Sequence, residues 1–260
     1  DNIDIIFAVD KSASMAVKDV TPSRHEVMVK EIINFVGSPS IREGDRLTIF
    51  TFSEKSNWRM PLSQDREEFL DKLLEIEQPK DRVYYDRSQL YTQFSVLLVH
   101  IPQALDTWDN FSKWYTYPRV VFIFSDGDNY DDNSLNAPLA VLARRDIKVY
   151  TIGVGTPRGG SITVKIAAES NPQILEPTLI RSKLNMKNLD LIKNKTGGKS
   201  FVISGSSNQA QGFMAAAVTE NRKPTLTLVQ TGEAENFWWH FLAIPALVIT
   251  TLMVRKFVAP

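Results

Sequence analysis

Unbroken apolar runs that alternate with helical patterns constrain the fold of this chain most strongly. The runs cover residues 5–9, 119–124 and 148–154, and branched and aromatic side chains dominate each of them. Strands buried on both faces have such runs, and when they alternate with helices they form parallel sheets covered by helices on both sides. The sequence therefore predicts an α/β fold with a doubly wound, mostly parallel sheet.

The other predicted elements fit the same alternation. Apolar periodicity predicts helices at residues 22–36, 64–77, 94–105, 134–145, 186–195 and 210–220. Further strands are expected at residues 45–53 and 199–203, with a short edge strand at 58–62. Two segments are expected outside this core, a polar loop with several tyrosines at 78–91 and an excursion or hairpin at 156–182.

Three oxygen-bearing side chains follow the first apolar run at alternate positions. These are Asp10, Ser12 and Ser14, and Asp126 follows the run at 119–124 in the same way. Ligands bind beyond the carboxyl ends of strands in such sheets, and a carboxylate with hydroxyls suits a small hard cation such as Mg²⁺. The alternative is that the first three residues only turn the chain and cap the next helix.

Composition limits the other classes of function. The chain has 260 residues, of which 43% are hydrophobic, and its 30 basic and 30 acidic side chains balance. Without net charge or a basic run with interleaved aromatic residues, a nucleic-acid partner is not expected. The chain has no cysteine. Disulfides, thiolate metal sites and a cysteine nucleophile are therefore excluded, while both the cytosol and an oxidising compartment remain compatible.

The C-terminal part predicts a membrane anchor. We expect a domain at residues 1–221, a connector at 222–236, a transmembrane helix at 237–254 and a short cytoplasmic tail at 255–260. The apolar run is near the lower limit of the roughly 17–25 residues that span a bilayer. Trp238 and Trp239 suit one membrane interface, and Arg255 and Lys256 predict a cytoplasmic C-terminus. The alternative is a buried terminal helix of a soluble protein.

These residues together resemble the von Willebrand factor A (VWA) domain over about residues 3–220. The metal-ion-dependent adhesion site (MIDAS) of that family has an Asp-x-Ser-x-Ser loop, a Thr in a second loop and an Asp in a third. Asp10, Ser12 and Ser14 match the first, Thr92 the second and Asp126 the third. The resemblance implies a Rossmann-like VWA fold and a Mg²⁺ site, with Mn²⁺ or Ca²⁺ as alternatives, in which the third Asp usually acts through water.

Several segments are more specifically similar to the bacterial membrane-anchored proteins of the BatA/BatB aerotolerance type. They include Asp45-Arg46-Leu47, the run Ile152-Gly153-Val154-Gly155-Thr156 and Thr196-Gly197-Gly198. Two positions depart from that group, Ala13 in place of Gly and Tyr91 before Thr92. The resemblance implies a bacterial inner membrane location with the VWA domain on the periplasmic side. It also implies possible partners, a paralogous VWA membrane protein and a MoxR-type AAA+ ATPase.

The function expected from these features is non-enzymatic. A cation with two carboxylate neighbours stays electrophilic, so an acidic residue of a protein partner can complete its shell. Such a domain would help to assemble or regulate an envelope complex. The alternatives are a metal-dependent hydrolase, disfavoured because the motifs contain neither a His or Glu base nor a phosphate-binding loop, and a surface adhesin.

Three further groups of residues are candidates for other roles. One group is read mostly as a solvated acidic rim around Asp126, and it consists of Ser125, Asp128, Asn129, Asp131 and Asp132. The histidines His25, His100 and His240 lack metal or triad spacing and are expected to be structural or surface residues. The aromatic residues Trp108, Phe111, Trp114, Tyr115 and Tyr117 either contact a partner or the membrane surface, or pack over the sheet edge.

Overall fold

A six-stranded sheet forms the centre of the computed structural model, which describes residues 2–76, 84–85, 90–111, 117–130, 134–167, 175–205 and 210–222. Its strand order is β3-β2-β1-β5-β6-β9, and only β3 runs antiparallel to its neighbour. The bounds are β1 (Asp4–Asp10), β2 (Arg46–Phe52), β3 (Ser56–Ser63), β5 (Arg119–Ser125), β6 (Lys148–Val154) and β9 (Ser200–Ile203). The mostly parallel α/β sheet predicted from the apolar runs is therefore present.

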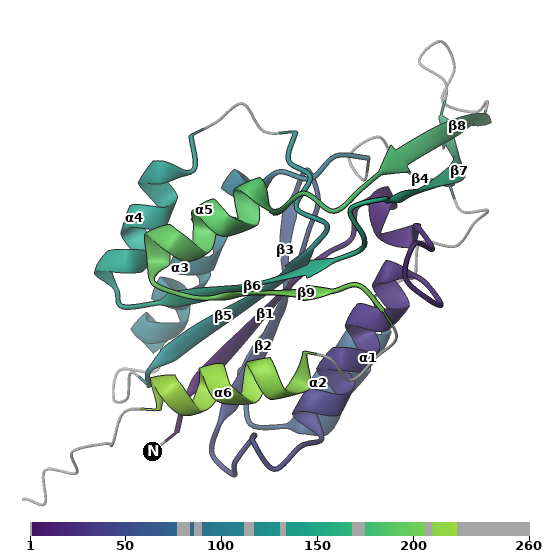
Figure 1. Ribbon diagram of the computed structural model, residues 1–260. Helices are drawn as coiled ribbons and strands as arrows, with labels where there is room; N and C mark the ends of the chain where they lie inside the picture. The colour runs from purple at the N-terminus through teal and green to yellow at the C-terminus, as the bar shows by residue number, and fades with distance from the viewer. Residues whose placement is uncertain are drawn as a thin grey trace, which may run out of the picture. The chain divides into compact units, whose positions relative to one another are not determined.

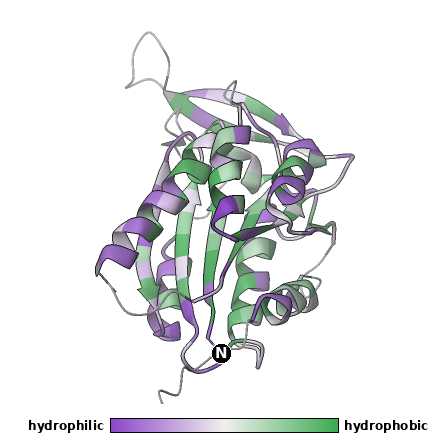
Figure 2. Cartoon of the chain, turned by 90° about the vertical axis from the view of Figure 1, so that its left-hand side faces the viewer, coloured by the Kyte–Doolittle hydropathy of each residue, from purple (hydrophilic) through white to green (hydrophobic). Residues whose placement is uncertain are grey.

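Helices cover both faces of this sheet (Figure 1). One layer contains α1 (Arg24–Val36), α2 (Arg66–Leu74) and α6 (Gln211–Asn221), and the other contains α3 (Phe94–Phe111), α4 (Asn136–Arg144) and α5 (Met186–Thr196). The central strand β1 serves both layers, because Phe7 packs into the first core and Ile6 into the second. Figure 2 shows the hydrophobic strands enclosed between the helices.

A second, three-stranded sheet lies beside the carboxyl ends of the main strands (Figure 1). It contains β4 (Tyr84–Tyr85), β7 (Gly160–Ala167) and β8 (Leu175–Ser182), and β7 and β8 form the expected hairpin. The strand β4, which pairs in parallel with β7, lies inside the segment predicted as a loop. Two residues are too few for a recognisable alternation, so the prediction of an uninterrupted loop was wrong.

The hairpin packs on a short 3₁₀ helix, η1 (Ala13–Ala16), that follows β1. Ala13 is fully buried there in a cluster with Val17 and with Ile162 and Val164 of the hairpin. A methyl group at this position thus contributes to the contact between the first loop and the hairpin. Alanine at position 13, where the similar bacterial proteins have glycine, therefore fits the structure.

The chain divides into a unit of residues 1–223 and a unit of residues 224–260. All described residues belong to the first unit, so the predicted transmembrane helix at 237–254 lies outside the described residues. Within the described residues no helix is long and apolar enough to cross a membrane.

Two adjacent glycines before β9 provide a test of this packing. A Cβ on Gly198 would lie 1.9 Å from the carbonyl oxygen of Val149, whereas one on Gly197, at φ +74°, would meet nothing within 4 Å. We expect Gly197→Ala to lower the free energy of unfolding by about 1 kcal/mol because of its left-handed backbone. Gly198→Ala should cost on the order of 3 kcal/mol, because two backbones must separate. Urea unfolding measures both, and equal losses would contradict the close approach of this loop to β6.

Candidate functional site

Asp10 ends the central strand β1, and its side chain is fully buried. Its Oδ1 atom accepts a hydrogen bond from the backbone N–H of Ser12 at 2.8 Å, which turns the chain directly after the strand. The hydroxyls of Ser12 and Ser14 then lie 3.0 Å apart. The first loop thus gathers one carboxylate and two hydroxyls in a small buried volume.

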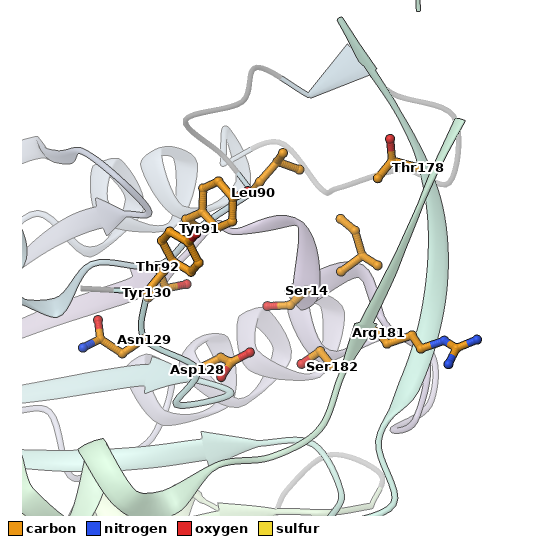
Figure 3. Close-up of a pocket in the computed structure, with 11 residues that line it drawn as sticks. Ser14, Leu90, Tyr91, Thr92, Asp128, Asn129, Tyr130, Thr178, Arg181 and Ser182 are labelled. Atoms are coloured by element: carbon orange, nitrogen blue, oxygen red, sulfur yellow. The ribbon is translucent and has the colours of Figure 1, made fainter. Parts of the chain in front are cut away.

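Thr92 comes from the loop before α3 and donates a hydrogen bond to Asp10, with its Oγ1 atom 3.1 Å from Oδ2. Two backbone contacts hold this loop, from Gln93 N–H to the Ser53 carbonyl and from Tyr130 N–H to the Thr92 carbonyl, both at 2.9 Å. The preceding Tyr91 does not displace Thr92, because its ring stacks on that of Tyr130 at 4.2 Å between centroids (Figure 3).

Ser125 ends β5, which pairs directly with β1, and Asp126 follows it. The Ser125 hydroxyl donates to Asp10 Oδ2 at 2.6 Å. The Asp126 carboxylate accepts from Arg24 Nη1 at 2.7 Å and from the Ser182 hydroxyl at 2.6 Å, both through Oδ2. The side chains of Arg24 and Asp126 are both completely buried.

Arg24 is held in place by its local sequence as well as by its partners. It begins α1 directly after Ser23, which caps the helix by accepting from the Glu26 N–H and donating to the Glu26 carboxylate. Both carboxylate oxygens of Asp19 accept from the guanidinium, at 2.8 and 2.9 Å. Arg24 therefore bridges two carboxylates, and these contacts fix its position in the site.

The local electrostatics differ between the carboxyl groups. Burial, and then the charge of Asp126, raise the pKa of Asp10 to about 7, against hydrogen bonds from Ser125 and Ser12. For Asp19, burial opposes ionisation, but hydrogen bonds from Arg24 and Thr156 outweigh it and lower the pKa. Of these two, Asp10 is the carboxyl whose charge the surroundings compensate less.

The comparisons with known proteins agree with this arrangement. Residues 5–129 match the family of the von Willebrand factor type A domain. This stretch of the chain therefore belongs to a VWA domain. A curated relative, an uncharacterised protein of Borreliella burgdorferi, is 24% identical over 205 residues, which are 75% of this chain and 52% of the relative. The chain therefore spans about half the length of the curated relative it matches.

Solved structures show that the VWA fold extends over most of the chain. The protein BatB from Bacteroides thetaiotaomicron has a TM-score of 0.67 at 21% identity, covering 84% of this chain and 98% of its own. An aerotolerance-related membrane protein from Bacteroides fragilis has a TM-score of 0.63 at 20% identity, covering 85% and 98%. The mussel byssus protein PTMP1, solved with a zinc-occupied MIDAS motif, has a TM-score of 0.54 at 15% identity, covering 84% and 47%.

The donor set of this VWA domain fits a hard divalent cation. The five side chains predicted from the sequence offer two carboxylates and three hydroxyls, all oxygen donors, and each residue is at least nine-tenths buried. No group of three or more His, Cys, Asp or Glu residues that could hold a metal occurs among the described residues. Any cation here would therefore depend on hydroxyl oxygens and few carboxylates, as the MIDAS resemblance implies.

The predicted acidic rim is only partly correct. Ser125 is fully buried and contacts Asp10, so its assignment to a solvated rim was wrong. Asp128 is exposed, and Asn129 accepts the Phe94 N–H at the start of α3. Asp131 and Asp132 lie outside the described residues. Ser125 is the last residue of β5, and its side chain points toward Asp10 at the end of the neighbouring strand β1.

The described histidines have structural surroundings. His25 is buried, and burial lowers its pKa to about 4, so the ring is neutral at physiological pH. His100 lies 3.0 Å from the Ser56 hydroxyl and edge-on to Phe50. His240 lies outside the described residues.

Part of the aromatic group packs near the amino end of the sheet. Trp108 and Tyr117 lie over the guanidinium of Arg46, at 5.7 and 4.3 Å from the ring centroids. The side chain of Phe111, and Trp114 and Tyr115 entirely, lie outside the described residues. For the two described members, packing at the sheet edge is therefore the observed role.

Asp10→Asn, measured in EDTA, tests the electrostatic cost of burying the Asp10 carboxylate without a cation. A carboxyl whose pKa is raised on folding destabilises the folded state when it is ionised. The full penalty applies at any pH above the folded pKa, and it disappears as the pH falls to the pKa of the unfolded state. We expect Asp10→Asn to be more stable than the parent by on the order of 2 kcal/mol at pH 8. The difference should shrink steadily between pH 7 and pH 4. A pH-independent difference in urea unfolding would contradict the raised pKa.

Arg24→Gln tests the buried bridge. Loss of the guanidinium leaves Asp126 and Asp19 without their cation, and we expect the free energy of unfolding to fall by about 3 kcal/mol. Because a divalent ion would restore positive charge beside Asp126, Mg²⁺ should stabilise the variant more than the parent. Arg119→Gln is the matched control, since Arg119 also pairs with a buried carboxylate, Asp4, but at the opposite end of β1. An equal Mg²⁺ response in all three proteins would contradict the role of Arg24 at the site.

Proposed function

We propose that this VWA domain is a non-enzymatic module that binds a protein partner through a divalent cation, with Mg²⁺ as the expected ion. Asp10, Ser12 and Ser14 would hold the cation, with Thr92 and Asp126 acting directly or through water. A cation in this position supplies an open, electrophilic coordination position for a carboxylate of the partner. The other contributions to the site come from residues of this chain.

The observation that carries the proposal is the charge balance of the converging side chains. Asp10 and Asp126 supply two negative charges, and the Asp126 carboxylate shares the buried guanidinium of Arg24 with Asp19. Part of the Asp126 charge is thereby neutralised, so a divalent ion at the site keeps net positive charge. An acidic side chain from outside is the group that such a centre attracts most strongly.

The geometry around Asp126 supports a role through water for this residue. Its Oδ2 atom already accepts from Arg24 and Ser182, and its Oδ1 atom lies 3.2 Å from the backbone nitrogen of Asp128. These three donors, one of them the charged guanidinium, fix the orientation of the Asp126 carboxylate and leave it little capacity to bind a cation directly. Asp10, with its raised pKa, is the residue that gains most from a bound cation.

The proposed setting is the bacterial inner membrane, with the VWA domain on the periplasmic side. The apolar run at 237–254, with its tryptophans and its basic flank, supports a membrane anchor. The similarity in fold to BatB and to an aerotolerance-related membrane protein supports the same setting. In this proposal the partner belongs to an envelope complex and is a paralogous VWA protein or a component linked to a MoxR-type ATPase.

Affinity capture with the full-length protein from its native membranes tests the proposal. We expect a partner that is retained with Mg²⁺ and lost both with EDTA and with Ser14→Ala, which removes one hydroxyl donor without burying a charge. Ser63→Ala is the control, because Ser63 lies on β3 and its hydroxyl bonds to Asp65 and Glu68 at the start of α2. Mass spectrometry identifies the bound proteins.

Partners that remain in EDTA and with Ser14→Ala would overturn metal-dependent docking. Hydrolysis of a phosphate or peptide substrate that requires Asp10 would instead favour the alternative of a metal-dependent hydrolase. Calorimetric titration with Mg²⁺, Mn²⁺ and Ca²⁺ identifies the cation independently of any partner.

A further inference from the structure

Two adjacent cavities lie beside the site, the first between the Thr92 loop and the hairpin and the second at the base of the hairpin. One has a volume of about 320 Å³ and is lined in part by Ser14 and Thr92. The other has a volume of about 600 Å³ and extends toward the base of the hairpin. Asp128, Arg181 and Ser182 line both cavities. Because they share these three residues, the two cavities are adjacent, and together they are called the trough; its first cavity contains the metal-site residues Ser14 and Thr92.

One end of the trough is aromatic and apolar. Tyr91 and Tyr130 stack on each other yet remain 41% and 67% exposed. Leu90 and Ile180 line the same cavity from the Thr92 loop and from β8. Figure 3 shows the tyrosine pair on one side of Ser14 and the strand with Ser182 and Arg181 on the other. Large exposed aromatic rings beside a site are typical anchors for an apolar side chain of a partner.

The other end of the trough is basic. Arg158, Arg181 and Lys183 line the second cavity and are exposed. Among the described residues, none of these three cations forms an ion pair with a carboxylate. Among the described residues that line this cavity, Asp128 alone is acidic, against three basic residues. This end therefore presents an excess of positive charge to solvent.

We propose that the trough binds an extended, acidic segment of a protein partner. One carboxylate of the segment reaches the cation site through the first cavity, and an apolar or aromatic side chain packs on the tyrosine pair. Further acidic side chains on the other flank meet the three basic residues. This inference rests on the proposed function and names the chemistry of the partner, while the tyrosine pair and the basic cluster determine which carboxylates are accepted.

The arrangement of the lining residues suits an extended peptide. Side chains in an extended chain repeat every 3.3 Å or so and alternate in direction, so neighbours of the metal-bound carboxylate can reach both the tyrosine pair and the basic residues. Each flank adds a contact of different chemistry, which gives the segment a direction as well as an affinity. A single small anion would use the basic end and leave the tyrosine pair unused.

Selection from a random peptide display library on the full-length protein tests the inference. With Mg²⁺ present, we expect enriched peptides to carry an Asp or Glu with an aromatic or aliphatic residue on one side and further acidic residues on the other. Tyr130→Ser should weaken binding of an enriched peptide roughly fivefold, and the double variant Arg158→Glu and Lys183→Glu roughly tenfold, by fluorescence polarisation. All the substituted side chains are exposed, so folding should be preserved.

Matched controls distinguish the trough from general surface effects. Leu179→Ser is the control for Tyr130→Ser, because Leu179 is an exposed apolar residue of β8 that lines neither cavity. The double variant Arg144→Glu and Lys195→Glu is the control for the basic pair, because it reverses two exposed charges on the helices α4 and α5. Both controls should bind the enriched peptide as the parent does. Equal losses in the controls and the trough variants would overturn the inference.

The outcomes also separate this inference from the proposed function. Enriched peptides that require Mg²⁺ and a central carboxylate but have no preference in their flanks would overturn the trough and leave metal-dependent docking intact. Peptides that bind equally in EDTA would overturn both. Enrichment of acidic residues alone, without the apolar flank, would identify a general anion site and would also contradict the inference.

Discussion

The buried contact between Arg24 and Asp126 is the interaction on which the arrangement of the site depends. It joins the first turn of α1 to the end of β5, and Ser182 adds the end of the hairpin to the same contact. A buried ion pair is favourable only when further hydrogen bonds satisfy both groups. Here Asp19 and Ser182 supply them, so three segments distant in the sequence are fixed relative to one another.

The same contact determines what the site can attract. In the proposed function, two carboxylates without the guanidinium would hold a divalent ion close to neutrality, and an additional acidic ligand would gain little. Because Arg24 neutralises part of the Asp126 charge, the bound ion would stay electrophilic. The basic residues of the second cavity would extend this positive character along the hairpin, away from the main sheet. The proposed binding of acidic partners is thus favoured by residues at both sheets.

The sequence predicted much of the fold because β1, β5 and β6 are buried on both faces and read as apolar runs. Asp10, Ser12 and Ser14 could be found because one short loop carries all three. Arg24 could not, because its partner Asp126 lies 102 positions away and nothing in the local pattern marks the pair. The same holds for Ser182, which is 56 positions from Asp126, and for the two-residue strand β4. Long-range polar contacts leave no periodicity in a sequence.

The placement of β1 at the centre of the sheet gives the two walls of the trough different resistance to opening. Asp10 can leave its position only if the innermost strand is exposed, which requires near-global unfolding and predicts very slow amide exchange there. The hairpin of β7 and β8, by contrast, is joined to the rest mainly through η1 and the contact of Ser182 with Arg24. The contact of Ser182 must break before the hairpin moves, but this costs less free energy than exposing β1, so a partner bound as proposed would meet one rigid wall and one more adjustable wall.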